Sequence, residues 1–70
     1  MTAKDYKLLA QFLGQSLARA HALGGEEART LLYDAAYTGA VEMLAADNPR
    51  FDQTRFSYAV AQAEHAAYVA

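Results

Sequence analysis

Apolar side chains recur at helical spacing along nearly the whole chain, and only two short stretches interrupt them. The first is Gly24-Gly25, and glycine tolerates the left-handed conformation in which helices often end. The second is Asp47–Phe51, where Asp and Asn favour turns and the only proline, Pro49, pushes the residue before it out of the α region. We therefore predict an all-α fold, a compact three-helix domain with helices at roughly 3–23, 26–46 and 53–69 and short loops at these two stretches.

The chain is too short for more than one hydrophobic core, since it has 70 residues and one core normally serves up to roughly 250. A chain of this size buries only about 60% of the surface that its unfolded form exposes, so oligomerisation would help to stabilise it. We expect one helical domain over residues 1–70 that forms a homo-oligomer, with a symmetric dimer as the leading arrangement. Cysteine is absent, which excludes disulfides and zinc–thiolate sites and favours a cytoplasmic protein.

The first predicted helix is amphipathic and begins at a capping pattern. Thr2 followed by Asp5 resembles a capping box, in which the Thr hydroxyl accepts a backbone N–H of the first turn. Leu8 and Phe12 fall to one side of the core-facing stripe, beside Arg19, and we expect them to form an apolar shoulder that a neighbouring molecule covers. The stripe itself, at about 100° per residue, consists of Tyr6, Leu9, Leu13, Ser16, Leu17, Ala20 and Leu23.

The second predicted helix, 26–46, is apolar over most of its circumference. Its apolar arc leaves only a narrow polar strip around Thr30, Asp34 and Thr38. The large side chains of the arc are Leu31, Leu32, Tyr33, Tyr37, Met43 and Leu44. Helices of this kind are surrounded by other elements, so we predict that this one lies at the centre of the fold. Gly39 should then permit the backbone of a neighbouring helix to approach closely.

The third predicted helix, 53–69, opens with the clearest local signal in the chain. Asp52 is a strong N-cap residue, and Phe51 just before it can pack on Phe56 one turn inside the helix, as a hydrophobic staple. A face rich in alanine is predicted to pack against the other helices, and it consists of Phe56, Ala59, Val60, Ala63, Ala66, Ala67 and Ala70.

The opposite side of the third helix is predicted to be a contact surface. Tyr58, Gln62, His65 and Val69 follow i, i+4, i+7, i+11 spacing there, and Tyr68 flanks them. On a helix that faces only solvent we would expect Lys and Glu at these positions, whereas tyrosine is enriched at interfaces. The competing interpretation is a frayed C-terminal turn that carries scattered aromatic residues.

The segment L-A-A-D-N-P-R-F-D-Q-T-R-F at residues 44–56, together with the opening M-T-A-K-D-Y-K-L-L-A, resembles small uncharacterised bacteriophage proteins of high-GC Gram-positive hosts. Those proteins carry an L-A-A-D-N-P-R-F-D-x-x-R-F segment near the C-terminus, and the resemblance implies no particular activity. This chain departs from the pattern after Phe56, where 57–70 replace a short ending that often contains Cys. Neither the turn nor the cap requires Arg50 and Arg55, so they are either solvated or available to a partner's carboxylate or phosphate.

The residues that could carry chemistry do not form a catalytic or metal-binding pattern. Neither His21 nor His65 has a second histidine at i+3 or i+4, so we expect no metal site. Glu64 and His65 are adjacent and diverge by about 100°, so they cannot converge within one helix, while convergence across helices stays open. We therefore predict that the protein is not an enzyme and takes no cofactor.

Charge and hydropathy argue against two other classes of partner. The net charge is −2 and the third helix has only Arg55 as a basic residue, which disfavours nucleic-acid binding. No stretch approaches the ~20 apolar residues that span a bilayer, so we expect no membrane association. What remains is a phage accessory protein that binds a host or phage protein in the host cytoplasm, and a small regulator associated with nucleic acid is the alternative. The identity of the protein partner does not follow from the sequence.

Overall fold

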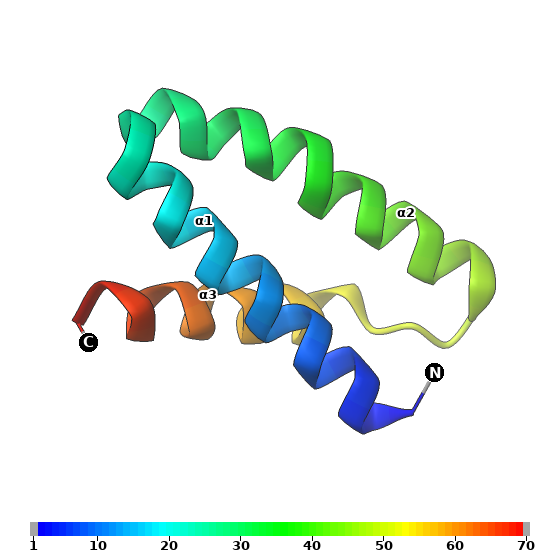
Figure 1. The fold of residues 1–70 in the computed structure, drawn as a ribbon. Helices are drawn as coiled ribbons and strands as arrows, with labels where there is room; N and C mark the ends of the chain where they lie inside the picture. The colour runs from blue at the N-terminus through cyan, green and yellow to red at the C-terminus, as the bar shows by residue number, and fades with distance from the viewer. Residues whose placement is uncertain (1, 70) are drawn as a thin grey trace.

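Helices make up the chain, as expected from a sequence rich in helix-forming residues with a single proline. The computed structural model describes residues 2–69. Its elements are α1 (Ala3–Leu32), the π-helix η1 (Tyr33–Tyr37), α2 (Thr38–Asp47) and α3 (Gln53–Val69), and residues 2–69 contain no strand. The predicted all-α class is therefore confirmed (Figure 1).

The first helix, α1, begins at the predicted capping box. The backbone N–H of Thr2 donates to Asp5 Oδ2 over 3.0 Å, and the N–H of Asp5 donates to Thr2 Oγ1 over 3.3 Å. These bonds satisfy N–H groups that a helix start leaves without an acceptor. The bond from the Thr2 backbone is the main reason that the pKa of the Asp5 carboxyl lies below its ordinary value.

A sharp bend interrupts α1 at Gly25. Its φ of 76° and ψ of −166° lie outside the helical region, and the positive φ suits glycine, which has no Cβ. Beyond this residue the chain runs back in roughly the opposite direction to the first half of α1 (Figure 1). The break between the first two helices was predicted at Gly24-Gly25 and occurs there, but it consists of one non-helical residue, Gly25, and not of a loop. One residue with positive φ is enough to reverse the chain here, so a longer loop is not needed.

The returning segment contains a π-helix, η1, that the sequence pattern did not indicate. The N–H of Thr38 donates to the carbonyl of Tyr33, five residues earlier. Tyr33 and Tyr37 stack with their ring centroids 4.5 Å apart. Because a π turn holds more residues than an α turn, it changes which side chains share a face before and after it.

The core draws side chains from α1, η1, α2 and α3, and α1 packs mainly against α3. The prediction that the second segment is the surrounded, central one is wrong. Leu31 is 72% exposed and Met43 is 75% exposed, although both belong to its apolar arc. Leu23 of the predicted core stripe is also exposed. The buried core residues are Ala10, Leu13, Leu17, Tyr37, Val41, Leu44, Phe56 and Val60.

The sequence predicted a close approach between helices at Gly39, but the approach occurs at Gly14. A Cβ added at Gly39 would meet nothing within 4 Å. A Cβ at Gly14 would lie 2.6 Å from the carbonyl oxygen of Val60 and 2.7 Å from the backbone nitrogen of Glu64. The missing side chain of Gly14 is therefore what allows the backbones of α1 and α3 to touch.

The start of α3 follows the prediction. The N–H of Arg55 donates to Asp52 Oδ1 over 3.0 Å, so Asp52 caps the helix. The rings of Phe51 and Phe56 meet edge to face with centroids 5.5 Å apart, so the predicted staple is confirmed.

The packed face of α3 differs from the predicted alanine face. Phe56, Val60 and Glu64 are buried, whereas Ala66 and Ala67 are exposed. The buried set repeats every four residues, which rotates the packed face toward Glu64 relative to the predicted one. Ala70, which was also placed on that face, lies outside the described residues.

Candidate functional site

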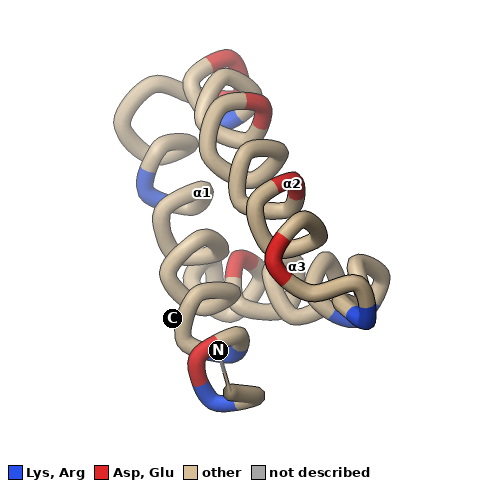
Figure 2. The backbone as a smooth tube through the Cα atoms, turned by 90° about the vertical axis from the view of Figure 1, so that its right-hand side faces the viewer, with Lys and Arg blue, Asp and Glu red and all other residues tan. Residues whose placement is uncertain are grey.

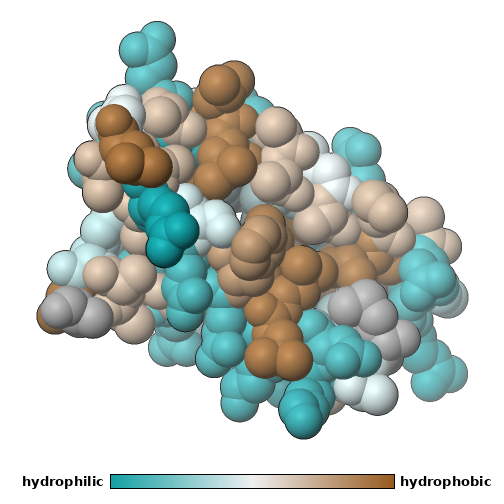
Figure 3. Space-filling view, viewed as in Figure 1, coloured by the Kyte–Doolittle hydropathy of each residue, from teal (hydrophilic) through white to brown (hydrophobic). Residues whose placement is uncertain are grey.

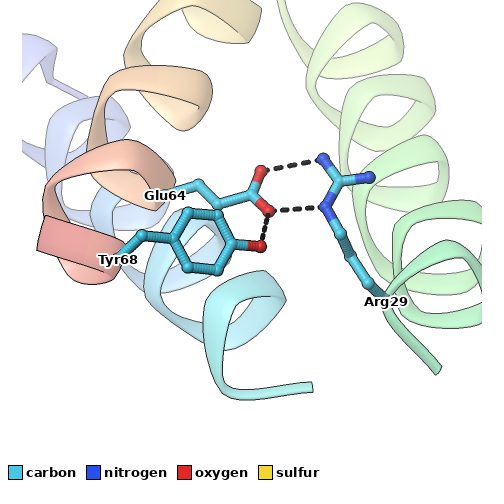
Figure 4. Close-up of polar contacts among 3 residues, drawn as sticks. All are labelled: Arg29, Glu64 and Tyr68. Atoms are coloured by element: carbon cyan, nitrogen blue, oxygen red, sulfur yellow. Dashed lines mark hydrogen bonds and ion pairs between the residues drawn. The ribbon is translucent and has the colours of Figure 1, made fainter. Parts of the chain in front are cut away.

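A charged cluster joins the second half of α1 to the end of α3 (Figure 4). Arg29 Nε donates to Glu64 Oε2 over 2.5 Å, and Arg29 Nη2 donates to Glu64 Oε1 over 2.8 Å. The hydroxyl of Tyr68 donates to Glu64 Oε2 over 2.6 Å. Both oxygens of a buried carboxylate are therefore satisfied by a bidentate arginine and a tyrosine.

Hydrogen bonding decides the protonation states in this cluster. The bond from Arg29 is the largest effect on Glu64, and it holds the pKa of the carboxyl below its ordinary value although burial opposes this. The same pair raises the pKa of Arg29, and the bond to Glu64 raises the pKa of Tyr68. A carboxylate that stays ionised and has its oxygens occupied is poorly suited to proton transfer, so the cluster holds helices together.

The structure also brings together the two histidines, which lie on different segments. His21 meets the ring of Tyr68 edge to face with centroids 5.7 Å apart, and His65 lines the same open hollow. Among residues 2–69, no group of three His, Asp or Glu side chains is arranged to hold a metal ion. Convergence across helices thus places the histidines near each other without forming a metal-binding set.

Sequence reasoning missed the pair of Arg29 and Glu64. Arg29 lies four residues before Tyr33 and eight before Tyr37, in the middle of an otherwise apolar arc. Glu64 lies four residues after the buried Val60. Each of these charged residues thus lies on the apolar face of its own helix. This signal could have suggested the pair, because charged side chains that are buried are normally paired.

We predict that Glu64→Gln lowers the free energy of unfolding at pH 7 by about 1–2 kcal/mol, because Arg29 loses its ionic partner. The pKa of Glu64 is lower in the folded chain than its ordinary value of 4.5. The stability that Glu64 contributes is therefore fully present above pH 4.5 and is lost as the pH falls through the folded pKa. The variant should therefore show a flatter loss of stability below pH 4.5 in urea titrations followed by circular dichroism. Glu42→Gln, at an exposed position on α2, is the matched control. Identical acid profiles for Glu64→Gln and the native chain would contradict the assignment.

The predicted contact surface on α3 is exposed. Tyr58 is 65% exposed and Val69 is 72% exposed, and Gln62 and His65 are exposed between them. Gln62 Nε2 donates to the hydroxyl of Tyr58 over 3.1 Å, which links two residues of this stripe. Tyr68 differs from the others, because its hydroxyl is bonded inward to Glu64. These residues are therefore accessible to a partner, and their role in binding stays a prediction.

Leu8 and Phe12 lie on the outer face of α1 and are not a shoulder beside its packed face. Leu8 is 54% exposed and Phe12 is 64% exposed, while Ala10, Leu13 and Leu17 face the core. The packed face is rotated from the predicted stripe because α1 meets α3 through Gly14. Apolar surface gathers over the N-terminal half of α1 in the space-filling view (Figure 3).

Arg50 and Arg55 lie at a hollow of about 410 Å³ that Lys7 also lines. Its apolar part includes Tyr6 and Phe51, whose rings stack with centroids 5.8 Å apart. The turn and the cap use only the backbone N–H groups of the two arginines. Elsewhere Lys and Arg are scattered along the chain and form no basic face (Figure 2).

No protein-family model, no curated protein and no solved structure matches this chain. Across residues 2–69, none of the helices combines the length and the apolar character needed to traverse a lipid bilayer. Its function has therefore to be inferred from its own residues.

Proposed function

We propose that this chain is a small, non-enzymatic phage accessory protein of the host cytoplasm that works by binding another protein. In this proposal it is a compact three-helix unit, in which the bend at Gly25 separates the first helix from the second. The observation that carries the proposal is the number of large apolar side chains that the fold leaves exposed. They are Leu8, Phe12, Leu23, Leu31, Met43, Tyr58, Tyr68 and Val69.

The outer side of α3 is the surface that best fits a protein partner. Two of its exposed side chains, Tyr58 and His65, are amphipathic, and the bond from Gln62 holds Tyr58 in place. Ordered aromatic side chains supply contact area at a low cost in conformational entropy. Arg55 lies in the first turn of α3 and Arg50 in the turn before it, where both can pair with carboxylates of the partner.

We expect the double variant Tyr58→Ala/His65→Ala to weaken capture of a protein partner from phage-infected host cells at least fivefold, or ~1 kcal/mol. Both positions are exposed, so the helicity and the melting temperature should stay close to those of the native chain. Leu31→Ala/Met43→Ala, which truncates two side chains of similar exposure away from α3, is the control. Recovery is measured by quantitative mass spectrometry after affinity purification. Equal recovery with all three proteins would rule out this surface.

A regulator that binds nucleic acid is the second candidate, and the gathering of Lys7, Arg50 and Arg55 at one hollow favours it. Three phosphate contacts would give a slope of roughly −2.7 for log K against log salt. A gel shift with random duplex DNA, at salt concentrations from about 50 to about 200 mM, distinguishes the candidates. No shift at low salt leaves protein binding as the function.

A further inference from the structure

We propose that the outer face of α1 binds the same face of a second copy of this chain, with the two helices antiparallel and crossing at Phe12. This contact rests on the proposed function, in which the chain is a protein-binding domain. It uses a different surface from the one on α3, and its partner is a second copy of the chain. Phe12 and Leu8 supply the apolar centre of the contact, and charged residues on either side set its direction.

The outer face of α1 has the residue spacing of a helix-packing seam. Asp5, Leu8, Phe12, Gln15 and Arg19 follow steps of three and four residues, and all five are exposed. The core-facing residues of α1 lie on the other side of the helix. Steps of three and four keep side chains in one line along a helix, which is how two helices pack along their length.

Charge complementarity gives the direction of the two helices. Asp5 lies seven residues before Phe12, and Arg19 lies seven residues after it. Since seven residues make about two turns, all three side chains share one face. In an antiparallel pair centred on Phe12, Asp5 of each copy lies opposite the partner's Arg19. A parallel pair would instead place like charges together, which is unfavourable.

The chain exposes more surface than a compact monomer of its mass, by about the area that one dimer interface would cover. A compact monomer of 7.6 kDa is expected to expose roughly 4,300 Å². This chain exposes 5084 Å², and its radius of gyration of 12.0 Å exceeds the ~11 Å expected for its length. The excess of roughly 800 Å² is about the area that each partner buries in a standard interface.

The exposed apolar residues on the returning segment do not suit a second copy equally well. Leu31 lines a hollow together with Glu26, Glu27 and Asp34, and no basic side chain lines it. Two copies of that surface would bring carboxylates together. The outer face of α1 combines an apolar centre with charges of both signs.

The test is the dimer dissociation constant of the full chain, measured by sedimentation velocity from low to high micromolar concentration. We expect Phe12→Ala to raise it at least tenfold, while Met43→Ala, a truncation at a 75% exposed site, leaves it unchanged. A native chain that stays monomeric at several hundred micromolar, or equal dissociation constants for the two variants, would overturn the proposal.

Charge reversal tests the direction of the helices. Arg19→Glu should weaken the dimer several-fold, because it places a carboxylate opposite the partner's Asp5. Adding Asp5→Lys to it restores opposite charges in an antiparallel pair, so the double variant should regain the native dissociation constant. In a parallel pair each residue lies opposite its own copy, so Arg19→Glu would replace one like-charge pair with another and this loss and recovery would not appear. Asp5→Lys alone, followed by circular dichroism, measures what loss of the capping box costs.

The two proposals fail separately. Phe12→Ala leaves the α3 surface intact, so it should still capture the heterologous partner if the proposed function is right. Loss of dimerisation with unchanged capture supports both surfaces. Dimerisation that persists in Phe12→Ala while Tyr58→Ala/His65→Ala loses capture would reject the α1 contact and keep the proposed function.

Discussion

Phe56→Ala is expected to lower the free energy of unfolding by about 3–5 kcal/mol. Phe56 is 5% exposed and its ring lies between those of Tyr37 and Phe51, with centroids 6.2 Å and 5.5 Å away. Truncation therefore removes buried contacts to η1 and to the turn before α3, and leaves a cavity that neither can fill. A chain of this length has a total stability of roughly 4–10 kcal/mol, so the variant should be close to unfolded at 37 °C.

Urea unfolding followed by circular dichroism measures this loss. Tyr58→Ala, two residues along the same helix and 65% exposed, is the control, and its stability should change by less than about 0.5 kcal/mol. A loss below about 1 kcal/mol for Phe56→Ala would mean that the aromatic contacts do not hold α3 to the rest of the fold.

Gly14→Val should cost about 3 kcal/mol, the upper part of the range for overpacking in a core. A Cβ at this position would lie 2.6 Å from the carbonyl oxygen of Val60, and backbone atoms cannot move aside as a flexible side chain does. The helices α1 and α3 would have to separate, which would also loosen the contacts of Leu13 and Leu17. Helix propensity alone would predict the opposite, because glycine within a helix is unfavourable by up to about 1 kcal/mol and replacing it should stabilise the helix.

Gly39→Ala is the matched control for the glycine prediction. No atom lies within 4 Å of a Cβ added there, so replacing this glycine should stabilise the chain by about 0.5–1 kcal/mol. Both variants are compared by thermal and urea unfolding. If Gly14→Val were as stable as Gly39→Ala, α1 and α3 would not be in close contact at Gly14.

The sequence by itself determined the features that depend on neighbouring residues. The capping box at Thr2, the cap at Asp52 and the staple of Phe51 and Phe56 all join residues no more than five positions apart. The same holds for the end of α2 before Pro49. Such contacts form whenever the local backbone is helical or turned, whatever the rest of the chain does.

Only the tertiary structure decided which helix faces meet. Gly14 lies against Val60, and Arg29 bonds to Glu64 thirty-five residues away, because the bend at Gly25 sets how the two halves of α1 meet α3. The π-helix at Tyr33 further changes the faces of the returning segment. Helical periodicity shows that a helix has an apolar side, but in a small domain many side chains of that side stay exposed. The choice among faces depends on distant backbone geometry, which residue spacing does not encode.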